Sequence, residues 1–86
     1  MTYNLQPKFD KALSFYGKAR VELDGDTKAL ISYETKVAEI KDGNVSLTAD
    51  DWAYTQTTLR HLKEFLLQEG FEAGTKKQIM KRYSHQ

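Results

Sequence analysis

The stretch VAEIKDGNVSLTADDW, residues 37–52, contains the two changes of pattern that decide the fold. Asp42-Gly43 stands between two short β-like runs, and this dipeptide is typical of a two-residue hairpin turn because both residues tolerate positive φ. After the SLTADD segment the apolar spacing changes from two residues to about 3.6, which indicates a helix. The chain therefore passes, within these residues, from an antiparallel sheet to a helical half.

Upstream of this hairpin the sequence predicts further short strands. From Phe15 to Leu23 apolar or small residues alternate with polar ones, which is the pattern of a strand with one buried face. The segment DGDT then provides a turn in which Gly25 can take positive φ. KALISYE and KVAEI are interpreted as the second and third strands. Residues 15–48 are thus expected to form an antiparallel β-meander of three to four strands.

Downstream, residues 51–69 are predicted to form the main helix, with Asp50 or Asp51 as its N-cap and Gly70 just after its end. At about 100° per residue, five side chains gather in one stripe that would face the sheet. They are Thr55, Thr58, Leu59, Leu62 and Leu66.

The same helical wheel assigns the polar side chains of TTLRHLKEFLLQEG, residues 57–70. Arg60, His61 and Glu64 are predicted to form the solvent-exposed face of the helix. Lys63 lies at the edge of the stripe, where its aliphatic stem can pack while its charge reaches water.

The C-terminal segment TKKQ has the form of a capping box, with Thr75 as N-cap and Gln78 reaching back. It would begin a short basic helix over residues 75–84. Residues 1–13 are predicted to be irregular or to contain a short helix. The fold class expected for this single domain, residues 1–86, is α+β: an antiparallel β-meander of three to four strands packed against one long C-terminal α-helix, with a short terminal helix.

Composition excludes several classes of function. The chain of 86 residues contains no cysteine, which excludes a disulfide framework, thiolate zinc sites and cysteine nucleophiles. No apolar run approaches the roughly 18 residues of a membrane span. We therefore expect a protein without membrane contact, in the cytoplasm of the cell that makes it.

Two sequence blocks resemble a known family. SFYGKARVE and KALISYETKVAEI, within residues 14–40, and then W…TTLRHLKEFLLQ.GF, residues 52–71, are similar to small uncharacterised proteins encoded by bacteriophages and prophages. That family shows a similar SFYGKA, a YSY-x-T-x-VA hairpin and a TTLRH-KEFL helix. In the hairpin block Ile31 stands where the family has tyrosine. The resemblance implies a phage or mobile-element context inside a bacterium, and it brings no activity or site residue with it.

Catalytic and metal sites find little support in the sequence. His61 and Glu64 are spaced three residues apart on a helix, but a metal site needs at least one further ligand. The acidic pairs in LDGDT and ADDW each have a sufficient structural reason, as a turn and as a helix start. We therefore expect no cofactor, no bound metal and no enzymatic activity.

Charge is distributed unevenly, which suggests two kinds of partner. Residues 22–51 carry eight acidic and three basic side chains, whereas residues 75–86 carry four basic and no acidic ones. The leading hypothesis is a protein-binding accessory module that inhibits a host or defence protein, and its predicted contacts are Asp24, Asp26, Asp42 and Tyr16. An alternative is weak nucleic-acid binding through Arg60, Lys63, Lys76, Lys77, Lys81 and Arg82. A third possibility is a structural, oligomeric phage component; the sequence leaves the oligomeric state open.

Overall fold

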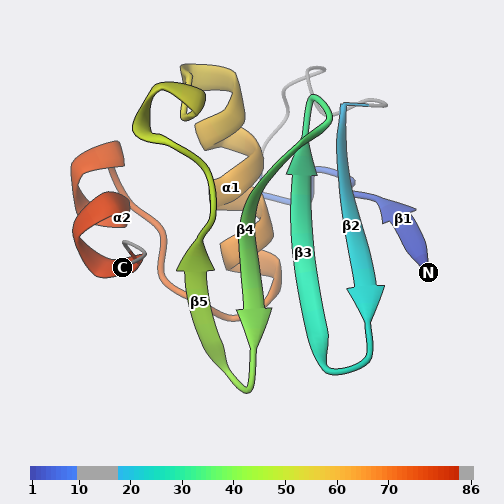
Figure 1. Ribbon diagram of the computed structural model, residues 1–86. Helices are drawn as coiled ribbons and strands as arrows, with labels where there is room; N and C mark the ends of the chain where they lie inside the picture. The colour runs from blue at the N-terminus through green and yellow to red at the C-terminus, as the bar shows by residue number, and fades with distance from the viewer. Residues whose placement is uncertain (10–17, 84–86) are drawn as a thin grey trace.

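The computed structural model describes residues 1–9 and 18–83 of the chain (Figure 1). A five-stranded antiparallel sheet with the strand order β1-β2-β3-β4-β5 is followed by a 3₁₀ turn and two α-helices. The fold is therefore α+β, as expected, with five strands in the described residues where the sequence predicted three to four. The elements are β1 (Thr2–Asn4), β2 (Ala19–Asp24), β3 (Thr27–Ser32), β4 (Thr35–Lys41), β5 (Asn44–Leu47), η2 (Asp51–Ala53), α1 (Gln56–Gln68) and α2 (Lys76–Tyr83).

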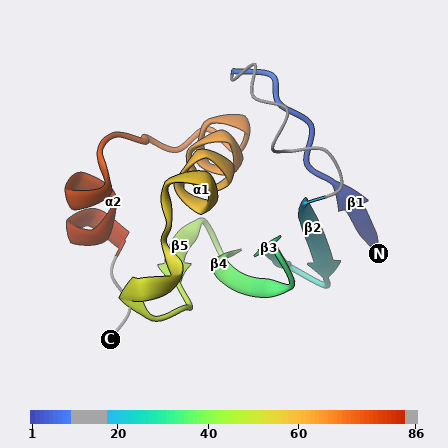
Figure 2. The same ribbon diagram turned by 90° about the horizontal axis from the view of Figure 1, so that it is seen from above.

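Both helices lie on one side of the sheet, with α1 over its centre and α2 beside β5 (Figure 2). The predicted alternation in β2 is confirmed, because Ala19 and Val21 are buried while Glu22 is exposed. One core fills the space between sheet and helices. Its buried apolar members are Leu5, Ala19, Val21, Leu30, Val37, Ala38, Leu47, Tyr54, Leu62, Phe65, Leu66 and Ile79.

Two of the predicted hairpin turns are confirmed. Asp42 and Gly43 connect β4 to β5 with φ angles of 52° and 77°, the positive pair that a type I′ turn requires. Gly25 has a φ of 62° in the two-residue connection from β2 to β3. Each glycine allows backbone geometry that a residue with a Cβ atom adopts only at a cost.

Two strand predictions were wrong. The second strand was expected to run through KALISYE, but β3 ends at Ser32, and Tyr33-Glu34 form the turn to β4. The additional strand, β1, comes from the N-terminal region that was predicted to be irregular or helical, and it pairs with β2 over Thr2–Asn4. The three residues of β1 are all exposed and show no apolar alternation, so their sequence does not indicate a strand. Their extended conformation comes from pairing with β2. Tyr16 lies outside the described residues.

The start of the main helix also differs from the prediction. Helix α1 begins at Gln56, and the side chain of Thr55, rather than that of Asp50 or Asp51, accepts the capping hydrogen bond from the Thr58 N–H. Asp51 instead begins the short η2 turn. A Thr N-cap satisfies the same orphan N–H groups as an aspartate would, so the acidic pair becomes unnecessary for capping α1.

Both predicted signals at the other helix ends are confirmed. Gly70 has a φ of 86° after α1, and the N–H of Phe71 donates to the Leu66 carbonyl at 2.8 Å, as in a Schellman motif. At the start of α2, the Thr75 N–H donates to Gln78 Oε1 at 3.0 Å and the Gln78 N–H donates to Thr75 Oγ1 at 3.2 Å. This is the reciprocal capping box.

The predicted exposed face of α1 was wrong for two of its three residues. Arg60 is exposed, but His61 and Glu64 have exposed fractions of 0% and 1%. Glu64 is covered by the N-terminal segment, because the N–H groups of Lys8 and Phe9 donate to its carboxylate at 2.9 and 3.0 Å. His61 is packed against the β3–β4 turn, where Ser32 Oγ lies 2.8 Å from its Nδ1 and the Tyr33 ring lies 5.6 Å from its own. Helix α1 is therefore covered on two sides, by the sheet and by residues 5–9.

Candidate functional site

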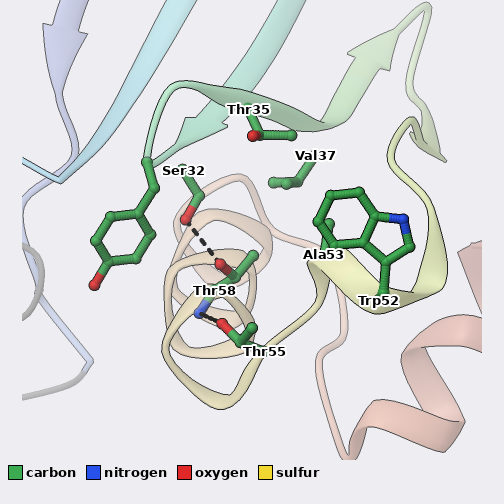
Figure 3. Close-up of a pocket in the computed structure, with 8 residues that line it drawn as sticks. Ser32, Thr35, Val37, Trp52, Ala53, Thr55 and Thr58 are labelled. Atoms are coloured by element: carbon green, nitrogen blue, oxygen red, sulfur yellow. Dashed lines mark hydrogen bonds between the residues drawn. The ribbon is translucent and has the colours of Figure 1, made fainter.

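A groove lies where the β3–β4 turn meets the start of α1 (Figure 3). Its volume is about 190 Å³. We call it the Trp52 groove. It is lined by Ser32, Tyr33, Thr35, Val37, Trp52, Ala53, Thr55 and Thr58.

Two aromatic side chains on this groove are exposed to solvent. Trp52 in η2 has an exposed fraction of 79%, and Tyr33 in the β3–β4 turn has one of 47%. Burial of the roughly 150–250 Å² of surface of a large aromatic side chain stabilises a protein by several kcal/mol. A folded protein therefore rarely leaves two such side chains exposed at one groove. Aromatic residues of this kind are enriched at the centres of protein interfaces.

The floor of the groove is a buried hydrogen-bonded network. Ser32 Oγ lies 3.1 Å from Thr58 Oγ1 and 2.8 Å from His61 Nδ1, which links the end of β3 to α1. All three side chains are buried. The rings of Tyr33 and His61 also lie 5.6 Å apart between centroids, tilted by 38°. Because buried polar groups with partners fix one geometry, this network holds the turn rigidly against the helix.

The turn itself has an unusual backbone for its sequence. Tyr33 and Glu34 have φ angles of 49° and 71°, the same positive pair that Asp42 and Gly43 adopt at the next turn. A residue with a bulky side chain at positive φ costs roughly 1–2 kcal/mol, and such residues are retained mainly at functional sites. The chain thus uses a favoured dipeptide at one type I′ turn and a disfavoured one beside the groove.

An ion pair joins the turn to β2. Arg20 Nη1 lies 2.8 Å from Glu34 Oε1, and a second hydrogen bond joins Nη2 to Oε2. The hydrogen bond and charge of Arg20 lower the pKa of the Glu34 carboxyl below its ordinary value. Glu34 is exposed and Arg20 is half-buried, so this ion pair at the surface orients the turn more than it stabilises the fold.

Tyr54 fixes the other wall of the groove. Its hydroxyl donates to the Val37 carbonyl at 2.6 Å and accepts from the Ala49 N–H at 3.2 Å. Burial raises the pKa of Tyr54, and the negative charges of Asp50 and Asp51 raise it further. The η2 segment, which carries Trp52, is thereby anchored to β4.

Asp50 and Asp51 precede Trp52 and are both exposed. Within the described residues, the Asp50 side chain makes no capping hydrogen bond to η2. Asp51 Oδ2 lies 3.8 Å from Lys76 Nζ, at the outer limit of an ion pair, and its side chain is 79% exposed. Neither aspartate lines the groove, but both are exposed and directly precede Trp52 in the chain.

The Ser32–His61 contact resembles part of a nucleophilic pair but is placed as a structural contact. Ser32 is only 2% exposed, and its hydroxyl is shared between His61 and Thr58. Ser32 lies at the floor of the groove, where its hydroxyl links β3 to α1 through both partners. Among residues 1–9 and 18–83, no three histidine or acidic side chains gather in a group that could hold a metal ion.

The basic residues predicted from the sequence are partly used by the fold. On α2, Lys76 pairs with Asp51, and Arg82 Nη1 lies 3.1 Å from Glu72 Oε2. Lys77 and Lys81 are exposed. Lys81 and Arg82 line a second pocket of about 400 Å³ together with Gln78. On α1, Arg60 is exposed and Lys63 is half-buried, the position expected at the edge of the apolar stripe.

The acidic residues predicted from the sequence do come together. Asp24 and Asp26 lie at the β2–β3 turn and Asp42 at the β4–β5 turn, and the pairing of Thr27 with Lys41 brings the two turns side by side. Both turns occupy the lower end of the sheet in Figure 1, whereas the β3–β4 turn is at the upper end. The acidic turns and the Trp52 groove are therefore separate surfaces.

Sequence reasoning missed the residues of the Trp52 groove. Trp52 was predicted to lie within the main helix, residues 51–69, and Tyr33 within the strand KALISYE. Two signals could have found them: the absence of a turn dipeptide between two strands, and a tryptophan directly after two acidic residues.

A comparison with protein-family models assigns the chain. The model of a family of unknown function, DUF8033, matches residues 3–81. The chain belongs to this family. The matched range includes all eight residues that line the Trp52 groove, so the groove is part of the DUF8033 domain. No curated protein and no solved structure is significantly similar to the chain.

Neither helix of this DUF8033 domain meets the requirements for crossing a membrane, within the residues that the structure describes.

Proposed function

We propose that the protein is a non-catalytic protein-binding module and that the Trp52 groove is its binding surface. The exposed indole of Trp52, 79% accessible beside the half-exposed Tyr33, carries this proposal. Tryptophan and tyrosine are the residue types that contribute most to binding when a partner covers them. Among the described residues, three large apolar side chains are more than half exposed: Met1, Phe9 and Trp52. Of these, Trp52 lies outside the N-terminal segment.

The rigidity of the groove supports the same function. The turn is held by the Ser32 hydroxyl and the η2 segment by Tyr54, so neither wall must become ordered when a partner binds. A preformed surface avoids the entropy cost of ordering, which is a large share of what weakens protein association. The strained Tyr33-Glu34 turn fits this view, since strain is retained where a side chain must be presented.

The biological setting is proposed from the resemblance to phage and prophage proteins. A small binding module from such a source can act by covering a surface of a host or defence protein. This would make the protein an inhibitor whose partner is a protein of the bacterial cell.

Nucleic-acid binding through α2 is the second candidate, and two observations weaken it. Lys76 and Arg82 have acidic partners, which are Asp51 in η2 and Glu72 in the connection between α1 and α2. The exposed Lys77 and Lys81 that remain give few phosphate contacts, and affinity for nucleic acid rises with their number.

The proposal is tested by comparing variants in affinity capture from a bacterial lysate. Trp52→Ala should remove the captured partner while changing the free energy of unfolding by about 0.5 kcal/mol or less, because an exposed side chain loses little packing. Leu67→Ala is the matched control, since Leu67 is an exposed apolar residue on α1 that does not line the groove. Capture of the same proteins by Trp52→Ala as by the unaltered chain would contradict the proposal.

A further inference from the structure

From the shape of the Trp52 groove and the two exposed carboxylates that directly precede Trp52, we infer that its occupant is an arginine side chain from a basic segment of the partner protein. The guanidinium group would lie on the face of the Trp52 indole and donate to the neighbouring carboxylates. This inference rests on the proposed function and names the chemistry of the partner.

The charges beside the indole favour a cation. Asp50 and Asp51 immediately precede Trp52, and α1 has taken Thr55 as its N-cap in place of either aspartate. Asp51 retains 79% exposure of its side chain despite Lys76 at 3.8 Å. A cation over an aromatic face is attracted by the ring quadrupole, and a nearby carboxylate adds a charge-assisted hydrogen bond. Both interactions are made by the same guanidinium group.

The groove has the size and polarity for one long side chain. Its volume is about 190 Å³, and its walls alternate methyl groups with hydroxyls, as Val37, Ala53 and Thr35 show in Figure 3. Thr35 is exposed, so its hydroxyl oxygen can accept a hydrogen bond from a bound group. The aliphatic stem of arginine suits the methyl groups, and its planar head suits both the indole and the oxygen acceptors.

The same charges disfavour a nucleobase stacked on Trp52. A stacked base brings its phosphates close to the binding aromatic residue. Asp50 and Asp51 would repel these phosphates. Among the described residues, Lys76 lies within ion-pair distance of Asp51 and partly offsets its charge. The groove is thus complementary to a basic protein segment and not to a polyanion.

A direct measurement is possible because Trp52 is the only tryptophan in the chain. Its fluorescence reports on the groove alone. The titrant is a short acetylated and amidated peptide in which arginine alternates with glycine and serine. The comparison titrants are the same peptide with citrulline, which keeps the shape and loses the charge, the same peptide with lysine, and a single-stranded oligothymidine.

The variant pair separates local from general electrostatics. Asp50→Asn combined with Asp51→Asn removes two negative charges beside the indole. Asp24→Asn combined with Asp26→Asn removes the same charge at the opposite end of the sheet and serves as the control. Far-UV circular dichroism and thermal unfolding establish that both variants remain folded.

The arginine peptide should change the Trp52 emission with a saturable curve. Its Kd should rise about tenfold with citrulline or in the Asp50/Asp51 variant, by less with lysine, and by about twofold or less in the Asp24/Asp26 variant. Equal affinity for the citrulline peptide, saturable binding of oligothymidine in its place, or no response to any titrant would overturn the inference. If Trp52-dependent capture from lysate persists with the Asp50/Asp51 variant, the proposed function stands and the arginine assignment fails.

Discussion

Glu64 shows how far a single residue can differ from its predicted surroundings. Its carboxylate is buried on α1, where it accepts hydrogen bonds from the N–H groups of Lys8 and Phe9 and from the Gln68 side chain. A buried charge is tolerated when its hydrogen-bonding capacity is satisfied in this way. Glu64 thus ties the N-terminal segment to a helix more than fifty residues away in sequence.

Replacing Glu64 with alanine should lower the free energy of unfolding by about 2–3 kcal/mol, because two backbone N–H groups lose their acceptor in a partly buried place. Urea unfolding followed by circular dichroism measures this change. Glu72→Ala is the control: Glu72 pairs with Arg82 at an exposed site, and its loss should cost about 0.5 kcal/mol or less. Equal stability of the two variants would show that Glu64 is not a structural tie.

The sequence could not reveal the burial of His61 and Glu64. A helical wheel assumes one covered side, and it correctly placed Leu62 and Leu66 against the sheet. The second cover, the N-terminal segment, has no apolar period of its own except the buried Leu5. Its position depends on hydrogen bonds between residues distant in sequence, which local patterns do not encode.

At the scale of elements, the two type I′ turns can be compared directly. Asp42-Gly43 and Tyr33-Glu34 have nearly the same φ angles, so the fold demands the same backbone from two different dipeptides. Only the first is a recognised turn signal, which explains why one turn was predicted and the other was missed. The Asp42-Gly43 hairpin, the glycine that ends α1, the capping box that begins α2 and the alternation of β2 were predictable, because each depends on residues close together in sequence.

Tyr33→Asn combined with Glu34→Gly should raise the free energy of unfolding by about 1–2 kcal/mol, because it relieves positive-φ strain at two positions. The same variant should bind the partner more weakly, since it removes an aromatic wall of the groove. Urea unfolding and the fluorescence titration measure the two effects. Asp42→Asn, at a turn that is already favourable, is the control and should change stability by about 0.5 kcal/mol or less. If the free energy of unfolding does not rise and the affinity for the partner does not fall in the Tyr33/Glu34 variant, the idea that strain is retained for function is refuted.

At the scale of the whole molecule, negative charge is present at both ends of the sheet. Asp50 and Asp51 directly precede the groove residue Trp52, and Asp24, Asp26 and Asp42 lie at the turns at the far end of the sheet. The first pair can contact an occupant of the groove, whereas the second set acts on it only through the long-range field. Short-range contacts govern mainly the dissociation rate, and long-range fields govern mainly the association rate.

Asp24→Lys combined with Asp26→Lys and Asp42→Asn should therefore slow association with a basic partner by several-fold at low salt and leave dissociation almost unchanged. Asparagine is chosen at Asp42 because it tolerates the φ of 52° there. Stopped-flow fluorescence of Trp52 with the arginine peptide gives both rate constants. A large rise in the dissociation rate would place the occupant at the acidic turns rather than in the groove.

The tie between Glu64 and the N-terminal segment also bears on how the chain is made. During synthesis the first nine residues leave the ribosome long before their partners on α1, and β1 must also wait for β2. The hairpins from β2 to β5 join neighbours in sequence and can form as they emerge, while contacts at large sequence separation are slow and come late. Residues 1–9 are therefore among the last parts of the domain to become ordered, because Glu64, which binds their N–H groups, is synthesised long after them.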